Sequence, residues 1–186
     1  MTTALVFGGA RSGKSAYAEK LASELANACG KRVVYIATAQ AGDVEMQARI
    51  RMHRQQRPGH WLTVEQPIEL GAVIRQHAAP DVVILVDCLT VWLSNLLFSE
   101  ARDYPEIGKI TPPDSFVLQR KLFLQALQGV QGNLVLVSNE VGMGIVPQGA
   151  ISRWFVDEAG RLNQAVAAAC DRVVWIAAGL PLALKG

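Results

Sequence analysis

The chain has 186 residues, of which 51% are hydrophobic and 18% are charged, and its formal net charge at pH 7 is +2. This length fits a single domain over residues 1–186, and so small a charge argues against a nucleic-acid partner. No apolar run approaches the roughly 20 residues of a membrane-spanning helix, and the N-terminal residues lack a signal-peptide pattern, so we expect a cytoplasmic protein without a membrane span.

Short apolar runs alternate with longer helical patterns along the chain. The runs cover residues 4–7, 32–37, 82–87, 133–138 and 172–177, and the helical patterns cover residues 14–28, 43–56, 89–99, 115–128 and 152–169. Continuous β-branched runs without polar alternation are typical of strands that are buried on both faces. The pattern therefore predicts an α/β protein with a three-layer fold, in which helices flank a mostly parallel sheet.

Two segments depart from this alternation. Residues 100–114 contain three prolines and mixed charges, which predicts an exposed excursion, and residues 141–149 form a glycine-rich loop after a predicted strand. We interpret Val173–Leu184 as a buried strand followed by a tail. Because ligands of open parallel sheets gather at the carboxyl ends of strands, loop 141–149, the loop after the first strand and the turn after Ala37 are expected to face one crevice.

The first motif is GGARSGKS, which matches G-x-x-x-x-G-K-[ST] between a predicted strand and a predicted helix. With this loop, the expected three-layer fold is of the P-loop NTPase type. Its backbone N–H groups are expected to surround phosphate oxygens, with the Lys14 ammonium beside the outer phosphates and the Ser15 hydroxyl on Mg²⁺. The predicted nucleotide contacts in this loop are Gly8, Gly9, Ala10, Arg11, Ser12, Gly13, Lys14 and Ser15.

Asp87 closes the run VVILVD and is the second predicted Mg²⁺ ligand, because such acids hold the metal or its water in phosphate-loop enzymes. The alternative is a strand-terminal aspartate that caps the next helix. A GTPase switch is disfavoured, since the chain has no N-K-x-D and its D-x-x-G, at residues 157–160, lies inside a predicted helix. A small kinase fits the loops better.

His53 lies in a predicted helix and is surrounded by cations. Arg49 is four residues before it, Arg57 is four residues after it, and Arg54 is adjacent. Neighbouring positive charges disfavour the imidazolium, so His53 is expected to be neutral and nucleophilic while the arginines bind a triphosphate. The alternative is a solvated basic helix that happens to contain a histidine.

Four segments give the chain a resemblance to a known family. GGARSGKS, YIATAQ (residues 35–40), HRQQRPGHW (residues 53–61) and SNEVGMGIVP (residues 138–147) occur in the order seen in the bifunctional adenosylcobinamide kinase and adenosylcobinamide-phosphate guanylyltransferases of cobalamin biosynthesis. Residues 160–186 are similar to the final helix and strand of that family. The resemblance covers nearly the whole chain.

The resemblance implies a transferase with two activities. It would phosphorylate the aminopropanol hydroxyl of adenosylcobinamide with ATP or GTP, and then transfer GMP from GTP to give adenosylcobinamide-GDP. His53 matches the guanylylated histidine, and some family members have glutamate at the position of Asp87. The family's GTP contacts beyond the loop fall on Thr38, Ala39, Gln40, Arg54, Gln55, Gln56, Arg57, Glu65 and Asp87. The family also implies a trimer.

Two other functions remain open from the residues alone. One is a monofunctional small-molecule kinase in which His53 and its arginines bind the acceptor, and the other is a nucleotide-dependent binding module without turnover.

Candidates for the corrinoid site are Asn139, Glu140 and residues 142–144. We expect reduced thiols at Cys29, Cys88 and Cys170, with Cys88 a buried small hydrophobe, and we expect surface or packing roles for His60 and His77.

Overall fold

The protein is described by a computed structural model that covers residues 1–28, 30–40, 42 and 57–186. Its elements are β1 (Thr3–Gly8), α1 (Lys14–Asn27), β2 (Arg32–Ala37), β3 (Leu62–Glu65), α3 (Leu70–His77), β4 (Val82–Asp87), α4 (Leu89–Leu97), α5 (Asp114–Gln128), β5 (Asn133–Asn139), α6 (Ala150–Ala169), β6 (Arg172–Ala177) and β7 (Leu180–Lys185). The predicted strands and four of the predicted helices are confirmed. The helix predicted over residues 43–56 lies outside the described residues.

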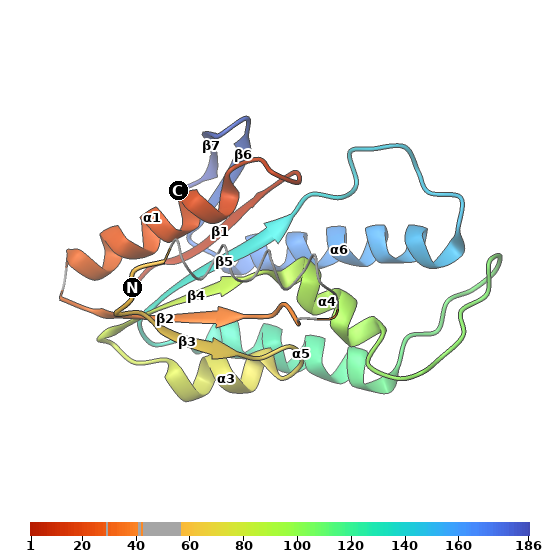
Figure 1. Ribbon diagram of the computed structural model, residues 1–186, viewed down its shortest axis with the longest axis horizontal. Coiled ribbons are helices and arrows are strands. Elements are labelled where there is room, and N and C mark those ends of the chain that lie inside the picture. Colours follow the sequence, from red (N-terminus) through yellow and green to blue (C-terminus); the bar gives the residue numbers. More distant parts are fainter. Residues whose placement is uncertain (29, 41, 43–56) are drawn as a thin grey trace.

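The strands form one sheet in the order β3-β2-β4-β5-β1-β6-β7, and every pair except β6 with β7 is parallel (Figure 1). The predicted mostly parallel sheet of a P-loop NTPase-type fold is therefore confirmed. At its carboxyl edge Gly8 pairs with Asn139, and Ala37 pairs with Asp87. The first loop, the turn after Ala37 and loop 141–149 thus leave the sheet at the same edge, as predicted.

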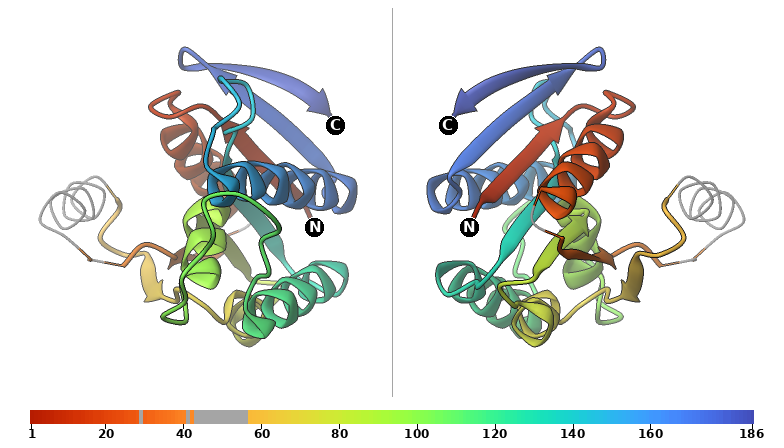
Figure 2. Two further views of the ribbon diagram at one scale, coloured as in Figure 1. Left: turned by 90° about the vertical axis from the view of Figure 1, so that its right-hand side faces the viewer. Right: turned by 90° about the vertical axis from the view of Figure 1, so that its left-hand side faces the viewer.

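Helices cover both faces of the sheet, which gives the three predicted layers (Figure 2). The larger core joins apolar side chains of α3, α4, α5 and α6 to one face, and it includes Trp92 and Phe123, whose ring centroids are 4.9 Å apart. The second core joins Ala18, Leu21 and Ala22 of α1 to the other face. Burial of each large apolar side chain stabilises such a core by about 1.5–3 kcal/mol.

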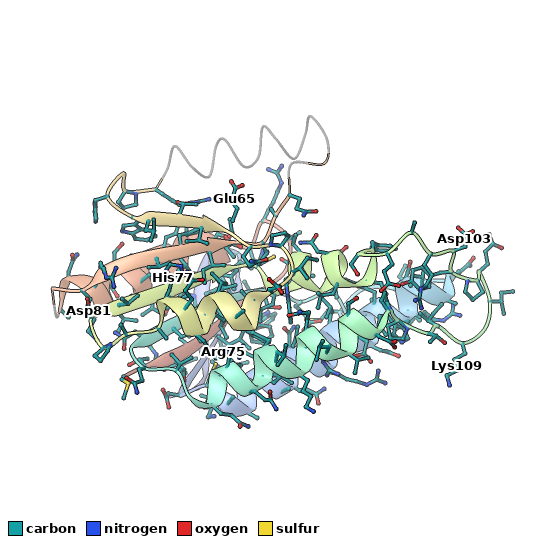
Figure 3. The ribbon with its side chains drawn as sticks, turned by 90° about the horizontal axis from the view of Figure 1, so that it is seen from below. Glu65, Arg75, His77, Asp81, Asp103 and Lys109 are labelled. Carbon is teal, nitrogen blue, oxygen red and sulfur yellow. The ribbon has the colours of Figure 1, made fainter. Side chains whose placement is uncertain are left out.

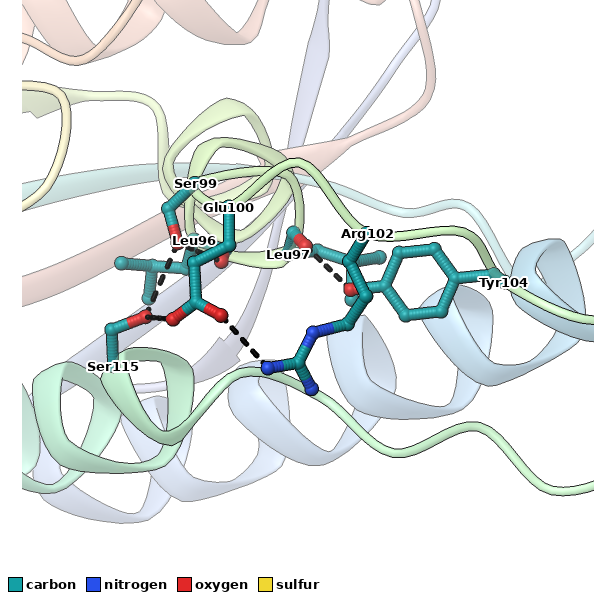
Figure 4. Close-up of polar contacts among 7 residues, drawn as sticks. All are labelled: Leu96, Leu97, Ser99, Glu100, Arg102, Tyr104 and Ser115. Atoms are coloured by element: carbon teal, nitrogen blue, oxygen red, sulfur yellow. Dashed lines mark hydrogen bonds and ion pairs between the residues drawn. The ribbon is translucent and has the colours of Figure 1, made fainter.

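Residues 100–113 connect α4 to α5 without a helix or strand and are mostly exposed, which confirms the predicted excursion. Its first residues are tied back to the fold by polar contacts (Figure 4). The Tyr104 hydroxyl donates to the Leu97 carbonyl oxygen at 2.6 Å, and Arg102 donates to Glu100 at 2.8 Å. The base of the excursion is therefore fixed against α4.

The C-terminal segment differs from the prediction. Ala178 and Gly179 have φ angles of 51° and 79°, and they turn the chain so that β7 runs antiparallel beside β6. Two consecutive residues with positive φ fit the twist of a hairpin. The predicted tail is therefore wrong: this segment is an edge strand, and all its residues are exposed. In the described part of the chain, no helix has the length and apolar character needed to cross a bilayer.

Candidate functional site

The glycine loop connects the end of β1 to the start of α1, as the motif requires. Gly13 is the residue before the helix and has φ of 95°, a left-handed conformation that glycine adopts without a steric penalty. The Lys14 ammonium donates to the Gly9 carbonyl oxygen at 3.3 Å, so its side chain curls over the loop. The N-terminus of α1 and this cation make the loop attractive to anions.

The start of the loop is hydrogen-bonded to the residue that follows β5. The Gly8 carbonyl oxygen accepts a hydrogen bond from the Glu140 N–H at 3.0 Å, at the end of β5. Ser12 is buried, and its hydroxyl oxygen has no hydrogen-bond partner among the described residues. Unpaired buried hydroxyl groups cost free energy. Ser12 is thus a buried polar group of the loop whose hydroxyl is unpaired within the described part of the chain.

Asp87 is the last residue of β4, and its Oδ2 accepts a hydrogen bond from the Tyr35 hydroxyl at 3.1 Å. The capping alternative is wrong, because Cys88 is the N-cap residue of α4 and its Sγ accepts from the Val91 N–H at 3.5 Å. Burial, and after it the nearby Asp87 charge, raise the pKa of the Cys88 thiol to about 12. Cys88 is therefore a buried neutral thiol, as predicted.

Arg57 packs over the face of the Tyr35 ring. Its guanidinium carbon lies 3.5 Å from the centroid of the Tyr35 ring, and its Nε lies 4.0 Å from Glu19 Oε1. Burial raises the pKa of Glu19; Arg57 opposes this shift and the Asp87 charge adds to it. The pKa of Tyr35 is also raised, mainly by burial and then by Asp87. The Tyr35 hydroxyl therefore keeps its proton and donates a hydrogen bond to the Asp87 carboxylate.

The turn after β2 is shaped by Thr38, which is fully buried. Its hydroxyl donates to the Cys88 carbonyl oxygen at 2.8 Å and accepts from the Cys88 N–H at 2.9 Å. Its carbonyl oxygen accepts from the Asn95 amide at 2.7 Å. These bonds hold the ends of β2 and β4 together, and the partly or fully exposed Ala39 and Gln40 follow.

A buried polar network fixes the end of β5. Ser138 Oγ donates to Asn163 Oδ1 at 2.6 Å, the Asn163 amide donates to the Asn139 carbonyl oxygen at 3.1 Å, and Thr90 Oγ1 accepts from the Asn139 N–H at 2.7 Å. Fully paired buried networks make the local geometry rigid. Helices α4 and α6 thereby hold the strand that separates β1 from β4.

Loop 141–149 follows this strand and is mostly exposed. The Glu140 carboxylate accepts from the Gly142 N–H at 2.6 Å, and the Arg153 guanidinium donates to the carbonyl oxygens of Pro147 and Gln148. Between these ties, Ile145 is 98% exposed, and Met143 and Val146 are exposed as well. The loop therefore presents apolar side chains beside the carboxyl edge of the sheet.

Glu65 ends β3 and pairs with Ala37 of β2, so this predicted contact lies at the same edge of the sheet (Figure 3). Arg75 and His77 belong to α3, and Asp103 and Lys109 lie on the excursion. His60 is exposed and His77 is half-buried, which agrees with the roles expected for them.

Several predicted residues lie outside the described part of the chain: Cys29, Arg49, His53, Arg54, Gln55 and Gln56. Within the described part, no group of three or more His, Cys, Asp or Glu side chains is arranged to hold a metal ion. Magnesium in nucleotide sites needs only one or two protein groups besides phosphate oxygens and waters. A hydroxyl at Ser15 and a carboxylate at Asp87 are oxygen donors of the kind that this ion prefers.

Sequence reasoning missed Glu19, Tyr35 and Asn95 as members of this edge. Tyr35 lies inside an apolar strand and reads as core, and Glu19 reads as a solvated helix position. For Tyr35, two signals were available: a polar atom within an otherwise apolar strand, at a position that faces α1, and its place in the family segment YIATAQ.

A family model described as cobinamide kinase / cobinamide phosphate guanyltransferase matches residues 4–184. A Pseudomonas aeruginosa protein named bifunctional adenosylcobalamin biosynthesis protein CobP is 49% identical over 182 residues, which cover 98% of this chain and 96% of that protein. Proteins named bifunctional adenosylcobalamin biosynthesis protein CobU are 42% identical in Salmonella typhimurium, over 97% of this chain and 98% of that protein, and 42% identical in Escherichia coli, with the same two coverages. The similarity thus extends from the phosphate loop to the C-terminal hairpin.

Proposed function

The chain belongs to the cobinamide kinase / cobinamide phosphate guanyltransferase family, and from this membership we propose that it phosphorylates adenosylcobinamide with ATP or GTP and then transfers GMP from GTP to the new phosphate. The product would be adenosylcobinamide-GDP. The observation that carries the proposal is an intact phosphate loop between β1 and α1, inside a family match over residues 4–184. A kinase alone or a binding module explains this match less well.

In the kinase step, a hydroxyl of the corrinoid attacks the γ-phosphorus and the nucleoside diphosphate leaves. The Lys14 ammonium and the loop N–H groups would stabilise the charge on the transferring phosphoryl group. Ser15 and Asp87 are the residues that would hold Mg²⁺, which supplies further charge neutralisation when it is bound. We propose the whole loop from Gly8 to Ser15, together with Asp87, as nucleotide contacts.

In the transferase step, the neutral imidazole of His53 attacks the α-phosphorus of GTP and expels pyrophosphate. The phosphate of the corrinoid then attacks the resulting phosphoramidate, GMP is transferred, and the imidazole is released. Covalent catalysis divides a displacement between two anions into two easier steps. Support comes from the segment HRQQRPGHW. Its Arg57 stacks on the ring of Tyr35, whose hydroxyl is bonded to Asp87 at the carboxyl edge of the sheet.

The remaining GTP contacts are proposed from the family pattern. They are Thr38, Ala39, Gln40, Arg54, Gln55, Gln56, Arg57 and Glu65. Since the polar atoms of Thr38 are engaged within the protein, its role would be to shape the turn, and the direct contacts would come from Ala39 and Gln40.

For the corrinoid we propose the surface formed by Asn139, Glu140 and loop 141–149. A corrin ring is a large apolar macrocycle edged by amides, and the exposed Met143, Ile145 and Val146 lie on the loop that leaves the phosphate-binding edge. We further propose a single domain that assembles as a trimer, acts in the cytoplasm and has no nucleic-acid partner.

The test of the guanylyl-histidine is incubation with GTP labelled at the α-phosphate. Wild-type protein should acquire acid-labile, alkali-stable label, and His53→Ala should acquire none while it keeps some kinase activity. His60→Ala is the matched control, because this exposed histidine lies in the same family segment. Label that persists on His53→Ala would show that the assignment is wrong.

A further inference from the structure

Tyr35 of β2 contacts two residues that the proposed function places around the nucleotide. Its ring is almost fully buried, with Arg57 stacked on its face at 3.5 Å and Asp87 bound to its hydroxyl at 3.1 Å. We propose that Tyr35 is a positioning residue that holds Asp87 and Arg57 together in the geometry that binds the magnesium–nucleotide complex. This inference rests on the proposed roles of those two residues.

The hydroxyl of Tyr35 acts on the carboxylate of Asp87. It engages Oδ2, which fixes the rotation of the carboxylate and lets the other oxygen face a cation. Carboxylates that bind metals are usually oriented by such a second hydrogen bond, and its loss typically weakens metal affinity or activity by roughly 10–100-fold. Removing the hydroxyl should therefore impair magnesium binding without moving Arg57.

The ring of Tyr35 acts on Arg57. The Arg57 side chain is only 7% exposed, and its Nε and Nη1 have no hydrogen-bond partner among the described residues. Its charge is offset by the Tyr35 ring and by Glu19 Oε1 at 4.0 Å. A desolvated guanidinium gains much from an aromatic face. Removing the ring should therefore release Arg57 as well as Asp87.

Three variants separate these two contacts. Tyr35→Phe removes the hydroxyl and keeps the ring, Tyr35→Leu removes both, and Asp87→Asn removes the proposed metal ligand. Tyr104→Phe is the matched control, because it also deletes a tyrosine hydroxyl that donates a hydrogen bond. Tyr104 donates to the Leu97 carbonyl oxygen, and both residues are distant in sequence from the phosphate loop (Figure 4). Thermal unfolding of each variant without nucleotide tests whether it folds.

The main readout is the dissociation constant of GTP by calorimetry, measured with Mg²⁺ and with EDTA. Mg²⁺ strengthens GTP binding, and this gain in affinity should be about tenfold smaller in Tyr35→Phe than in wild type. The GTP dissociation constant of Tyr35→Phe in EDTA should equal that of wild type. Tyr35→Leu should weaken GTP binding about tenfold in EDTA too, because Arg57 has lost its support. The Mg²⁺ concentration for half-maximal kinase activity should rise in both variants, and Tyr104→Phe should match wild type.

The double variant Tyr35→Phe/Asp87→Asn decides whether Tyr35 acts through Asp87. If it does, adding Tyr35→Phe to Asp87→Asn should change the magnesium dependence less than twofold. Wild-type magnesium dependence in Tyr35→Phe, or additive effects in the double variant, would overturn the inference while the proposed function stands. Wild-type magnesium dependence in Asp87→Asn would instead show that the proposed metal role of Asp87 is wrong, and the role of Tyr35 would fall with it.

Discussion

The main-chain N–H of Gly179 donates a hydrogen bond of 2.8 Å to the carbonyl oxygen of Ser12. The turn between β6 and β7 is thereby joined to the middle of the phosphate loop. The two chains also approach closely beside this bond, since a Cβ atom on Gly13 would lie 3.2 Å from the Gly179 Cα atom. The C-terminal hairpin is thus a support for the nucleotide site.

Gly8→Ala should destabilise the protein, whereas Gly9→Ala should not. A Cβ atom at Gly8 would lie 2.3 Å from the Ile176 carbonyl oxygen of β6, but a Cβ atom at Gly9 would meet nothing within 4 Å. Crowding of this kind costs about 1–3 kcal/mol. Urea unfolding at pH 7 measures the difference, and equal stability of the two variants would contradict it.

The same pair separates stability from ligand binding. Since Gly9 lies in the predicted phosphate cradle, a side chain there should weaken GTP binding even though the fold is intact. Calorimetry with GTP measures this effect. Gly9→Ala with wild-type affinity would show that phosphates do not approach the backbone at this position.

Lys14→Met should abolish most kinase turnover without unfolding the protein. The ammonium is the cation expected to stabilise the transferring phosphoryl group, and loss of such a group lowers kcat by roughly 10²–10³-fold. Its hydrogen bond to the Gly9 carbonyl oxygen is a small part of the fold, so the melting temperature should change little.

Lys20→Met is the matched control for Lys14. Lys20 lies on the same helix, and its ion pair with Glu24, at 3.9 Å, is exposed to solvent. Such pairs contribute little to stability. Steady-state kinase rates of both variants make the comparison, and a similar loss in both would show that the charge of α1 matters more than the position of Lys14.

Asp171→Asn should lower stability in a manner that depends on pH. The Asp171 carboxylate accepts hydrogen bonds from the Thr3 N–H at 2.8 Å and from the Thr3 hydroxyl at 2.9 Å, and these bonds lower the pKa of Asp171. A lowered pKa in the folded state contributes stability that is present above the ordinary carboxyl pKa. That contribution is lost as the pH falls through the lowered value.

The melting temperature of Asp171→Asn should therefore lie about 2 °C below wild type at pH 7, a modest effect because the carboxylate is exposed. The gap should narrow as the pH falls below about 4. Calorimetric scans across this range test the expectation, and a gap that does not change with pH would point to packing rather than charge.

Cys88 and Cys170 should resist thiol reagents in the folded protein. Burial is the main cause that raises the pKa of Cys88 to about 12 and of Cys170 to about 11, so both remain thiols at pH 8. In a Cys29→Ala background, a chromogenic disulfide reagent should titrate two thiols in urea and react slowly without it. Rapid reaction of either cysteine in the native protein would contradict the prediction.

Much of the fold follows from apolar runs that are buried on both faces. The run VVILVD predicted β4 and the position of Asp87, because a fully buried parallel strand has no polar alternation. Strands at the sheet edges gave weaker signals. Leu62–Glu65 is short and mostly exposed, and β7 was hidden because Ala178-Gly179 is an uncommon pair for a two-residue hairpin.

The site was predictable where a motif is local, and less so where contacts are distant in sequence. The eight residues of the phosphate loop are contiguous, so their arrangement follows from one strand-loop-helix unit. Tyr35 and Asp87 are 52 residues apart, and their hydrogen bond depends on the register between β2 and β4. Such a contact is set by the whole sheet.

Strand β1 contains residues made early in synthesis, yet its partners are β5 and β6, which lie far along the chain. Closing such long loops is slow and is rewarded only when both partners are present. The phosphate loop is therefore expected to reach its native shape late in folding, after residues 172–179 are available. A ribosome-bound chain that ends before β6 would have the nucleotide motif without a nucleotide site.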